Sequence, residues 1–248
     1  MKNNSELISV YKDTKNQFNG VPCLAETRVV GLDVLKNSVI RVENTDTVSA
    51  IIEASENNKR SCALNMASYR KPGGGVENGA QAQEEALFRC SNLFKTMLKP
   101  MYPLQSGEFL YSNDVTFVKD FHYKNIPWVT SDVVSVPAIN LNSKSYYDPL
   151  AESWVDCIEG KPSGYETITK AKIRAMLISA KNFDVKCMIL GAWGCGVFKN
   201  NPEDMARMFK EVLMDESYAT LFDEVVFPII NDHNSHGSNY EVFKSILA

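Results

Sequence analysis

The stretch "LNMASYRKPGGGVENGAQAQEE", residues 64–85, runs from a short apolar segment through three consecutive glycines and, after seven further residues, to Gln83, Glu84 and Glu85. The apolar segment "SCALNMAS" (61–68) predicts a buried strand. One capping residue is enough to begin a helix, so three glycines ahead of paired acids indicate a close approach to the backbone. We interpret the stretch as a strand, a ligand-binding loop and a helix.

A second stretch, "MILGAWGCGVFKNNPEDM" (188–205), repeats this organisation. A predicted strand is followed by a glycine loop and then by a helix with Asn201 as its cap and Pro202 at its first position. In open α/β sheets ligands bind beyond the carboxyl ends of the strands, where such loops gather. Successive inward-pointing amides bind anions, so we expect the two loops to hold a diphosphate together. Neither loop has the spacing of a Walker or dinucleotide-binding motif.

The remaining sequence alternates between strand and helix patterns. We predict helices at 5–18, at 45–55 (capped by Thr45 or Asp46), from Asn78 (with Gln81 at capping-box spacing) to Leu98, at 166–183, from Pro202 onward and at 238–247. We predict strands at 27–35, 38–44, 61–68, 114–121, 131–139, 186–193 and 222–230. Residues 140–163 indicate a long loop with some helical content. The alternation predicts a single α/β layered domain over residues 1–248, with a parallel or mixed sheet.

Composition and charge narrow the range of functions. The 248 residues are 44% apolar and 23% charged, as in an ordinary globular protein. A net charge of −4 leaves no basic field that would attract nucleic acid or an anionic membrane. The six cysteines include no CxxC pair, which predicts reduced thiols and no metal site. No segment is apolar enough for a secretory signal or a membrane span, so we expect a soluble, cytoplasmic protein.

The two adjacent glutamates need separate interpretations. Neighbouring helix positions diverge by about 100°, which predicts that Glu84 points toward the face of Leu87 and that Glu85 points away from it. Acids in a first turn also favour the helix dipole, and Glu85 is spaced to pair with Arg89, so a structural role stays open. The triple glycine favours a division of labour, in which one acid binds sugar hydroxyls and the other moves a proton. A general acid at neutral pH needs a raised pKa, which burial and a nearby phosphate would supply.

Three other features carry weaker signals. Phe198, directly after the second glycine loop, suits either stacking on a ribose or base or anchoring in the core. His233 and His236 have an HxxH spacing, but without a third ligand they favour solvated histidines over a metal site. Cys195 lies between two glycines with no histidine placed beside it by the sequence, so we expect it to fit a tight loop.

The two stretches together resemble the signature of the poly(ADP-ribose) glycohydrolases, which is three glycines, seven residues and then "QEE". Both "NMASYRKPGGGVENGAQAQEE" and "LGAWGCGVFKNNPEDMA" are similar to the bacterial, or microbial, branch of that family, in the right order and separation. The resemblance covers most of the chain. It implies a macrodomain-like fold that binds ADP-ribose, a three-layer α/β/α sandwich with a central mixed sheet and an N-terminal helical extension.

The resemblance also implies roles by motif position. Glu85 is then the catalytic acid, Glu84 binds ribose hydroxyls next to the scissile bond, and Gln83 supports the site. The glycine-rich catalytic loop comprises Gly73, Gly74, Gly75 and Val76. The diphosphate loop comprises Gly194, Cys195, Gly196, Val197 and Phe198, with Phe198 stacking. Asn65 and Ser68 lie where macrodomains and animal-type glycohydrolases carry ribose-contacting residues.

The implied reaction is hydrolysis of the ribose–ribose O-glycosidic bond in poly(ADP-ribose), mainly from the chain end. Glu85 protonates the leaving oxygen as an oxocarbenium-like sugar develops near the substrate's diphosphate, and water then attacks. The resemblance implies no metal or organic cofactor. The expected partners are poly(ADP-ribose), ADP-ribose and ADP-ribosylated macromolecules, without a membrane or sequence-specific nucleic-acid binding. Two alternatives stay open: a macrodomain that only binds ADP-ribose, which the intact "QEE" disfavours, and a hydrolase of ADP-ribose linked to protein, nucleic acid or acetyl groups.

Overall fold

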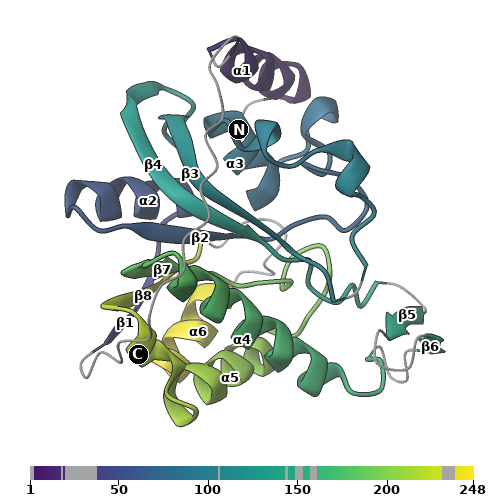
Figure 1. Cartoon of the computed structure of the whole chain (residues 1–248). Helices are drawn as coiled ribbons and strands as arrows, with labels where there is room; N and C mark the ends of the chain where they lie inside the picture. The colour runs from purple at the N-terminus through teal and green to yellow at the C-terminus, as the bar shows by residue number, and fades with distance from the viewer. Residues whose placement is uncertain are drawn as a thin grey trace.

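The structure is a computed structural model that describes residues 3–17, 19, 38–105, 107–142, 145–148, 153–156, 161–230 and 238–248 (Figure 1). The predicted strand at 27–35, the predicted pair His233 and His236, and the cysteines Cys23 and Cys157 lie outside these residues. Among the helices in these ranges, none has the length and apolar character needed to cross a membrane.

A six-stranded mixed sheet forms the centre of the molecule, with the strand order β1-β8-β7-β2-β4-β3. Five neighbouring strands run parallel, namely β1 (Val39–Glu43), β8 (Glu224–Pro228), β7 (Cys187–Ile189), β2 (Ser61–Asn65) and β4 (Asn125–Ser135). At one edge, β3 (Leu110–Lys119) pairs antiparallel with β4. Because the parallel strands point the same way, the loops after β1, β2, β7 and β8 meet at one edge of the sheet.

Helices cover both faces of this sheet (Figure 1). One face carries α2 (Thr47–Glu56) and α3 (Gln83–Cys90), and the N-terminal helix α1 (Asn4–Gln17) packs on α3. The other face carries α4 (Tyr165–Asn182), α5 (Pro202–Lys210) and α6 (Asn239–Leu247). Single turns of other helix types lie at Val76–Asn78, Leu93–Lys95, Lys99–Met101, Glu211–Asp215 and Tyr218–Leu221. The predicted α/β/α layering and N-terminal helical extension are therefore confirmed.

Alternation along the central strands separates two hydrophobic cores. In β2, Cys62 and Leu64 pack with residues of α4, α5 and α6, whereas Ala63 packs with residues of α1, α2 and α3. β8 alternates in the same way, since Phe227 belongs to the first core and Val226 to the second. Strands covered on both faces are apolar at successive positions, which is why "SCALN" shows no polar–apolar alternation. The two cores hold the sheet edge that carries the loops.

Two helix caps at that edge follow the sequence prediction. The Asp46 side chain accepts a hydrogen bond from Ser49 N at 2.9 Å and caps α2. The Asn201 side chain accepts from Glu203 N at 2.8 Å and caps α5, with Pro202 at the first helical position. Each cap contributes about 1 kcal/mol to stability. They fix where the chain turns from a loop into a helix beside the candidate site.

The helix predicted from Asn78 to Leu98 is wrong in extent. A single helical turn at Val76–Asn78 ends at Gly79, whose φ of 79° lies in the left-handed region. The helix α3 begins only at Gln83 and ends at Cys90, because Ser91 has extended backbone angles. The predicted apolar stripe is therefore divided between α3 and the short turn at Leu93–Lys95.

The segment at 140–163 also differs from its prediction. Two short strands, β5 (Ser145–Asp148) and β6 (Ser153–Asp156), pair antiparallel there in a separate two-stranded sheet. The sequences "SYYD" and "SWVD" are rich in aromatic and β-branched residues, which favour strands. Helical content is not found in the described part of this segment.

Candidate active site

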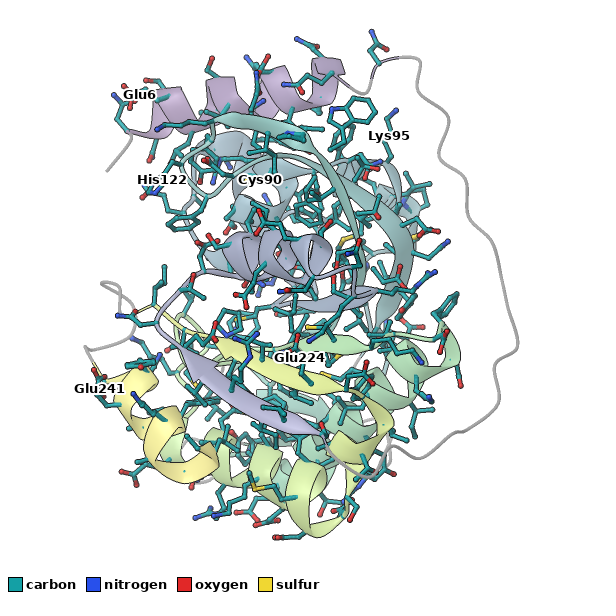
Figure 2. All side chains as sticks on the ribbon, turned by 90° about the vertical axis from the view of Figure 1, so that its left-hand side faces the viewer. Glu6, Cys90, Lys95, His122, Glu224 and Glu241 are labelled. Carbon is teal, nitrogen blue, oxygen red and sulfur yellow. The ribbon has the colours of Figure 1, made fainter. Side chains whose placement is uncertain are left out.

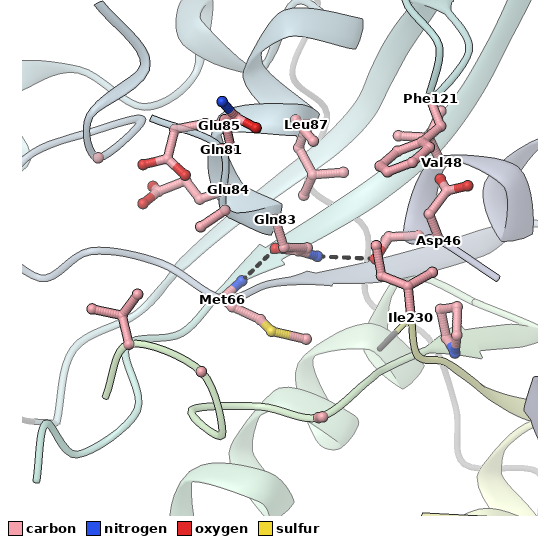
Figure 3. Close-up of a pocket in the computed structure, with 18 of the residues that line it drawn as sticks. Asp46, Val48, Met66, Gln81, Gln83, Glu84, Glu85, Leu87, Phe121 and Ile230 are labelled. Atoms are coloured by element: carbon pink, nitrogen blue, oxygen red, sulfur yellow. Dashed lines mark hydrogen bonds between the residues drawn. The ribbon is translucent and has the colours of Figure 1, made fainter. Parts of the chain in front are cut away.

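The loops at the carboxyl ends of the parallel strands line one cavity of about 730 Å³ (Figure 3). Ser68 contributes from the loop after β2, Phe198 from the loop after β7, Ile230 from the segment after β8 and Asp46 from the segment after β1. Ligand cavities span about 300–1,000 Å³, so this one suits a ligand larger than a simple sugar. Its position agrees with the prediction from the two strand–glycine-loop junctions.

The three glycines of the first loop pack directly against the glutamates of α3. The amide of Gly73 donates to Glu84 Oε1 at 3.1 Å, and the amide of Gly75 donates to Glu85 Oε1 at 2.8 Å. A Cβ atom on Gly74 would overlap Glu85 Oε1 and lie 3.1 Å from Glu84 Oε2, and φ there is 52°. Any other residue would have to displace Glu85 and adopt a left-handed backbone conformation. The groups that the loop approaches so closely are the two carboxylates.

The first loop is therefore not the anion nest that the sequence predicted. The amide of Gly74 donates to Lys71 O at 3.4 Å, and that of Val76 donates to Gly73 O at 2.9 Å. Together with Gly73 and Gly75, this gives four successive amides that already have partners. A diphosphate would have to displace these bonds to bind there.

The predicted divergence of the two acids is also wrong. Glu84 is 3% exposed and Glu85 is 6% exposed, and both carboxylates reach the same glycine, Gly74. Side chains in a helix lean toward its N-terminus, and here the amides of the glycine loop lie in that direction. The loop thus collects two carboxylates that the helix alone would separate.

Glu84 is held by three donors. Ser68 N donates to its Oε2 at 2.7 Å, Gly73 N donates to its Oε1, and Asn65 Nδ2 lies 3.5 Å from Oε1. Burial raises the pKa of Glu84 to about 8, and the charge of Glu85 adds to this effect. The donated hydrogen bonds act in the opposite direction without cancelling it. Both oxygens of this carboxyl group are therefore engaged by the protein.

Glu85 keeps one oxygen free. Its Oε1 accepts from Gly75, but its Oε2 is buried and has no hydrogen-bond partner among the described residues. Asn65 Oδ1 and the Tyr102 hydroxyl are two further buried atoms in this state. Burial, and then the charge of Glu84, raise the pKa of Tyr102, which places this hydroxyl within electrostatic reach of Glu84. Buried polar atoms without partners are satisfied by water or by a ligand.

The alternative structural pairing of Glu85 with Arg89 is not formed in the described part of the chain. The buried Arg89 guanidinium donates instead to the carbonyls of Leu7 at 3.1 Å and of Ala80. The Thr14 hydroxyl donates in turn to the carbonyl of Arg89. These bonds attach α1 to α3, so the N-terminal helix holds the helix that carries both acids.

Gln83 braces the start of α3 (Figure 3). Its Oε1 accepts from Met66 N at 2.9 Å, while its Nε2 donates to Leu64 O at 2.7 Å and to Thr47 Oγ1 at 3.2 Å. This side chain joins β2, α2 and α3 at the sheet edge. The supporting position expected for Gln83 agrees with these contacts.

Two other predicted residues of this half lie behind the cavity wall. Asn65 is fully buried and donates to Ser135 Oγ at 3.0 Å, and Val76 is 2% exposed in the core shared with α2 and α3. Neither lines the cavity, whereas Ser68 and Gly74 do. A contact between Asn65 and a ligand would therefore pass through Glu84.

The second loop, 194–198, differs from the first in how many of its backbone amides have hydrogen-bond partners. The Cys195 amide donates to Ala192 O at 3.1 Å. Within the described part of the chain, no hydrogen-bond partner is found for four other amides of this loop, those of Gly194, Gly196, Val197 and Phe198. Such a series of open N–H groups suits an anion.

Side-chain contacts hold the second loop in place. Asn200 Nδ2 donates to Ile139 O at 2.9 Å and to Gly194 O at 3.0 Å. Phe198 is half-buried, packs against the core and also lines the cavity, so its predicted stacking on a ligand stays a prediction. Cys195 is buried and does not line the cavity, and burial raises the pKa of its thiol. This agrees with its expected role of fitting a tight loop.

The end of the cavity away from the glutamates was missed by sequence reasoning. Asp46, Val48, Phe121 and Ile230 lie there, opposite Glu84 and Glu85 (Figure 3). The signal for Asp46 and Ile230 was available, since Asp46 follows one predicted strand and Ile230 is the last residue of another, and the ends of parallel strands meet at one sheet edge.

Two other cavity residues do not follow a predicted strand, so the strand pattern could not indicate them. His122 of the β3–β4 turn and Glu6 of α1 lie on the same side of the molecule and both line the cavity (Figure 2). Their position depends on how α1 and the β3–β4 turn pack, which no local motif encodes. Among the described residues, no group of three or more histidine, cysteine, aspartate or glutamate side chains is arranged to hold a metal ion.

Comparisons with known proteins show what the chain is similar to. Residues 4–120 match the family model described as the catalytic domain of microbial-type PARG, the poly(ADP-ribose) glycohydrolase. A search of curated proteins gives no match to this chain.

Solved structures similar to the chain include bacterial poly(ADP-ribose) glycohydrolases. That of Thermomonospora curvata bound to the inhibitor ADP-HPD has a TM-score of 0.77 and 22% identity, over 97% of this chain and 99% of that chain. That of Deinococcus radiodurans in complex with ADP-ribose has a TM-score of 0.71 and 25% identity, over 98% of this chain and 90% of that chain. Together with the family model, they confirm the resemblance predicted from the two glycine loops, the α/β fold and the assignment to the glycosidases.

Proposed function

We propose that this chain, whose residues 4–120 carry the catalytic-domain match to the microbial-type poly(ADP-ribose) glycohydrolases, hydrolyses ribose–ribose O-glycosidic bonds in poly(ADP-ribose). The observation that carries the proposal is a pair of buried glutamates at one end of a cavity whose second loop presents unpaired amides. The relatives solved with ADP-ribose or ADP-HPD support a ligand of the same kind.

The cavity supports one orientation of an ADP-ribose unit. The reacting ribose lies at Glu84 and Glu85, where buried polar atoms lack partners. The diphosphate lies on the open amides of loop 194–198, which supply hydrogen bonds without a basic side chain. The adenosine then extends toward Phe121 and Ile230, an apolar region that suits a base.

Glu85 is the general acid in this proposal. Its Oε2 is buried, unpartnered and beside the glycine loop, so a proton there has no competing acceptor in the described protein. As the bond between the anomeric carbon and the leaving oxygen breaks, Glu85 gives its proton to that oxygen. The bonding electrons go to the oxygen, which leaves an oxocarbenium-like ribose. Water adds to this carbon and returns a proton to Glu85, which completes the hydrolysis.

Glu84 suits a binding role despite its raised pKa. A pKa of about 8 would suit a general acid, but both of its oxygens accept backbone hydrogen bonds, from Ser68 and from Gly73. A carboxyl group fixed in this way has a defined orientation, which suits the recognition of ribose hydroxyls. Gln83 is the positioning residue, since it holds the first turn of α3 against β2.

The polymer is attacked mainly from its end in this proposal. The cavity accommodates about one ADP-ribose unit between the glutamates and Ile230. With Phe198 beside the adenosine-side ribose, a chain that continued from that ribose would meet the cavity wall. Terminal units therefore fit better than internal ones, and each cleavage releases one ADP-ribose.

The test uses two substrates and two readouts. The purified chain is incubated with poly(ADP-ribose) and, separately, with a mono-ADP-ribosylated protein, and free ADP-ribose is measured. We expect ADP-ribose from the polymer and slow or no release from the mono-ADP-ribosylated protein. On a sizing gel, long polymer should shorten gradually alongside monomer at early times. Release only from the mono-ADP-ribosylated protein would contradict the proposed substrate, and mid-length oligomers before monomer would contradict cleavage from the end.

A further inference from the structure

A segment of the first loop connects the candidate catalytic pair to exposed positive charge. Ser68 donates its amide to Glu84 Oε2 at 2.7 Å and lines the cavity. Arg70 and Lys71, two and three residues further on, are both exposed. Gly74, opposite the glutamates, follows them directly after Pro72 and Gly73. The segment that carries the two cations therefore begins and ends at residues that line the glutamate end of the cavity, although neither cation lines the cavity itself.

The backbone of this segment is fixed at each residue. The Arg70 amide donates to Ser68 Oγ at 3.2 Å, and Leu104 N donates to Tyr69 O at 2.8 Å. Lys71 O accepts from the Gly74 amide at 3.4 Å. Exposed side chains on a fixed backbone lose less entropy on binding than those of a free loop. Hydrogen bonds therefore hold the backbone of this segment in one conformation.

The two cations are not neutralised by acids of the chain. The Arg70 guanidinium lies 5.4 Å from the centre of the Tyr69 ring, and its Nε donates to the Tyr69 hydroxyl at 2.9 Å. Among the described residues, no hydrogen-bond partner is found for its terminal N–H groups. In the described part of the chain, neither Arg70 nor Lys71 has an ion-pair partner, although acidic residues outnumber basic ones by 30 to 26.

We propose that Arg70 and Lys71 form a second subsite, which binds the diphosphate of the ADP-ribose unit on the leaving side of the scissile bond. The inference rests on the proposed function, in which the cleaved unit fills the cavity. The rest of the polymer must then leave at the glutamate end, past Ser68 and Gly74. Its first diphosphate is the nearest polyanion, and a guanidinium beside an ammonium matches its charge.

With this subsite, the enzyme prefers polymer over a single protein-linked unit because the two substrates differ in their leaving groups. A terminal unit attached to another ADP-ribose offers a diphosphate to Arg70 and Lys71, whereas a single unit attached to a protein side chain does not. The contribution is electrostatic and exposed, so it weakens with salt. For single-stranded polyanions each neutralised phosphate adds about 0.7 to the salt slope, so two cations add about 1.4.

The experiment measures binding in a Glu85→Gln background, which prevents cleavage. End-labelled oligomers of poly(ADP-ribose) and free ADP-ribose are titrated against this parent and against the same protein with Arg70→Gln and Lys71→Gln. Lys210→Gln with Lys244→Gln is the matched control, since both lysines are exposed on α5 and α6 and the charge change is equal.

We expect the Arg70 and Lys71 changes to weaken oligomer binding about tenfold at low salt and to lower the salt slope by about 1.4, with ADP-ribose affinity unchanged. The control should alter neither. Oligomer affinity and salt slope that match the parent would overturn the subsite while leaving the proposed function intact. A parent that binds neither ADP-ribose nor oligomer would overturn both.

Discussion

The two glycine loops follow strands in the same way, but their backbone amides serve opposite purposes. In the first loop, the amides of Gly73 and Gly75 are used by Glu84 and Glu85. In the second loop, the amides of Gly196 and of three neighbours have no partner in the described part of the chain. One loop binds the protein's own acids, and the other is open to an anion from outside.

The two loops therefore need glycine for different reasons. Gly74 is required because any Cβ would occupy the position of a carboxylate oxygen. Gly194 is required because a Cβ would lie 2.6 Å from Asn200 Nδ2, the group that fixes the loop. A glycine-rich loop next to acidic residues is thus not by itself an anion site. What distinguishes an anion site from a loop that binds the protein's own acids is whether the backbone amides already have partners. Each prediction below tests one of the two loops.

We expect the largest effect from a substitution of Glu85, one of the two acids held by the first loop. Glu85→Gln removes the proton that the proposed mechanism gives to the leaving oxygen, so we expect kcat to fall about 10²–10⁴-fold. Affinity for ADP-ribose should stay within about tenfold, or about 1.4 kcal/mol, because the substitution keeps the shape and Gln can still accept from Gly75. Single-turnover release of ADP-ribose and calorimetry measure the two effects.

The control for this variant is Glu77→Gln, an acid of the same loop whose side chain is 70% exposed. It should retain near-normal turnover. Turnover of Glu85→Gln close to that of the control would assign the proton transfer to another group.

The second prediction concerns the burial of Glu84 under the first loop. Its folded pKa of about 8 lies above the ordinary glutamate value of 4.5, so the folded protein holds a proton that the unfolded chain has released between these values. The free energy of unfolding should therefore fall with rising pH by about 1.4 kcal/mol per unit in this window and level off above it. The variant Glu84→Gln lacks this contribution.

Chemical denaturation of both proteins from pH 5 to 9 isolates the effect, because the two proteins differ only in the carboxyl group of Glu84. Parallel pH dependences for the two proteins would show that Glu84 is ionised throughout.

The elements of the fold were largely readable because local signals determine them. The caps at Asp46 and Asn201 and the apolar run of β2 each depend on a few neighbouring residues. The predicted start of α3 was wrong because Gly79 adopts a positive φ. Its backbone lies so close to Asn4 of α1 that a Cβ atom would not fit there. That contact joins residues far apart in the sequence, so no local spacing predicts it.

The sequence predicted part of the candidate site, but not the hydrogen bonds among its residues. The motif placed Glu84, Glu85 and the glycines together, because a resemblance transfers residues by position. It did not predict that the loop amides bind the acids, since this depends on side-chain torsions and on burial. Phe121 and His122 were missed because a strand turn brings them to the cavity from the far edge of the sheet.

A third prediction breaks the first loop without touching an acid. Gly74→Ala places a methyl group where Glu85 Oε1 lies and forces an alanine to a φ of 52°. The left-handed conformation costs about 1–2 kcal/mol of stability. Displacement of Glu85 should lower kcat about 10–100-fold, since small misplacements of a catalytic group have effects of this size. ADP-ribose affinity should change little, because the amides proposed to bind the diphosphate are in the other loop. A large loss of affinity with normal kcat would reverse the roles of the two loops.

The smallest expected effect comes from the same substitution in the second loop, and it should appear in a different measurement. Gly194→Ala meets a similar backbone cost at a φ of 76° and displaces Asn200, whose side chain fixes the loop carbonyls. We therefore expect ADP and ADP-ribose to bind about tenfold more weakly while kcat at saturation is retained, because Glu84 and Glu85 are untouched. ADP is the informative ligand, since it carries the diphosphate without the reacting ribose. Thermal unfolding of Gly194→Ala and Gly74→Ala provides the matched control, because the two share the left-handed strain and differ only in what the new methyl group displaces. If both variants lose affinity and kcat in the same proportion, the two loops act as one unit and the contrast in their amides has no functional meaning.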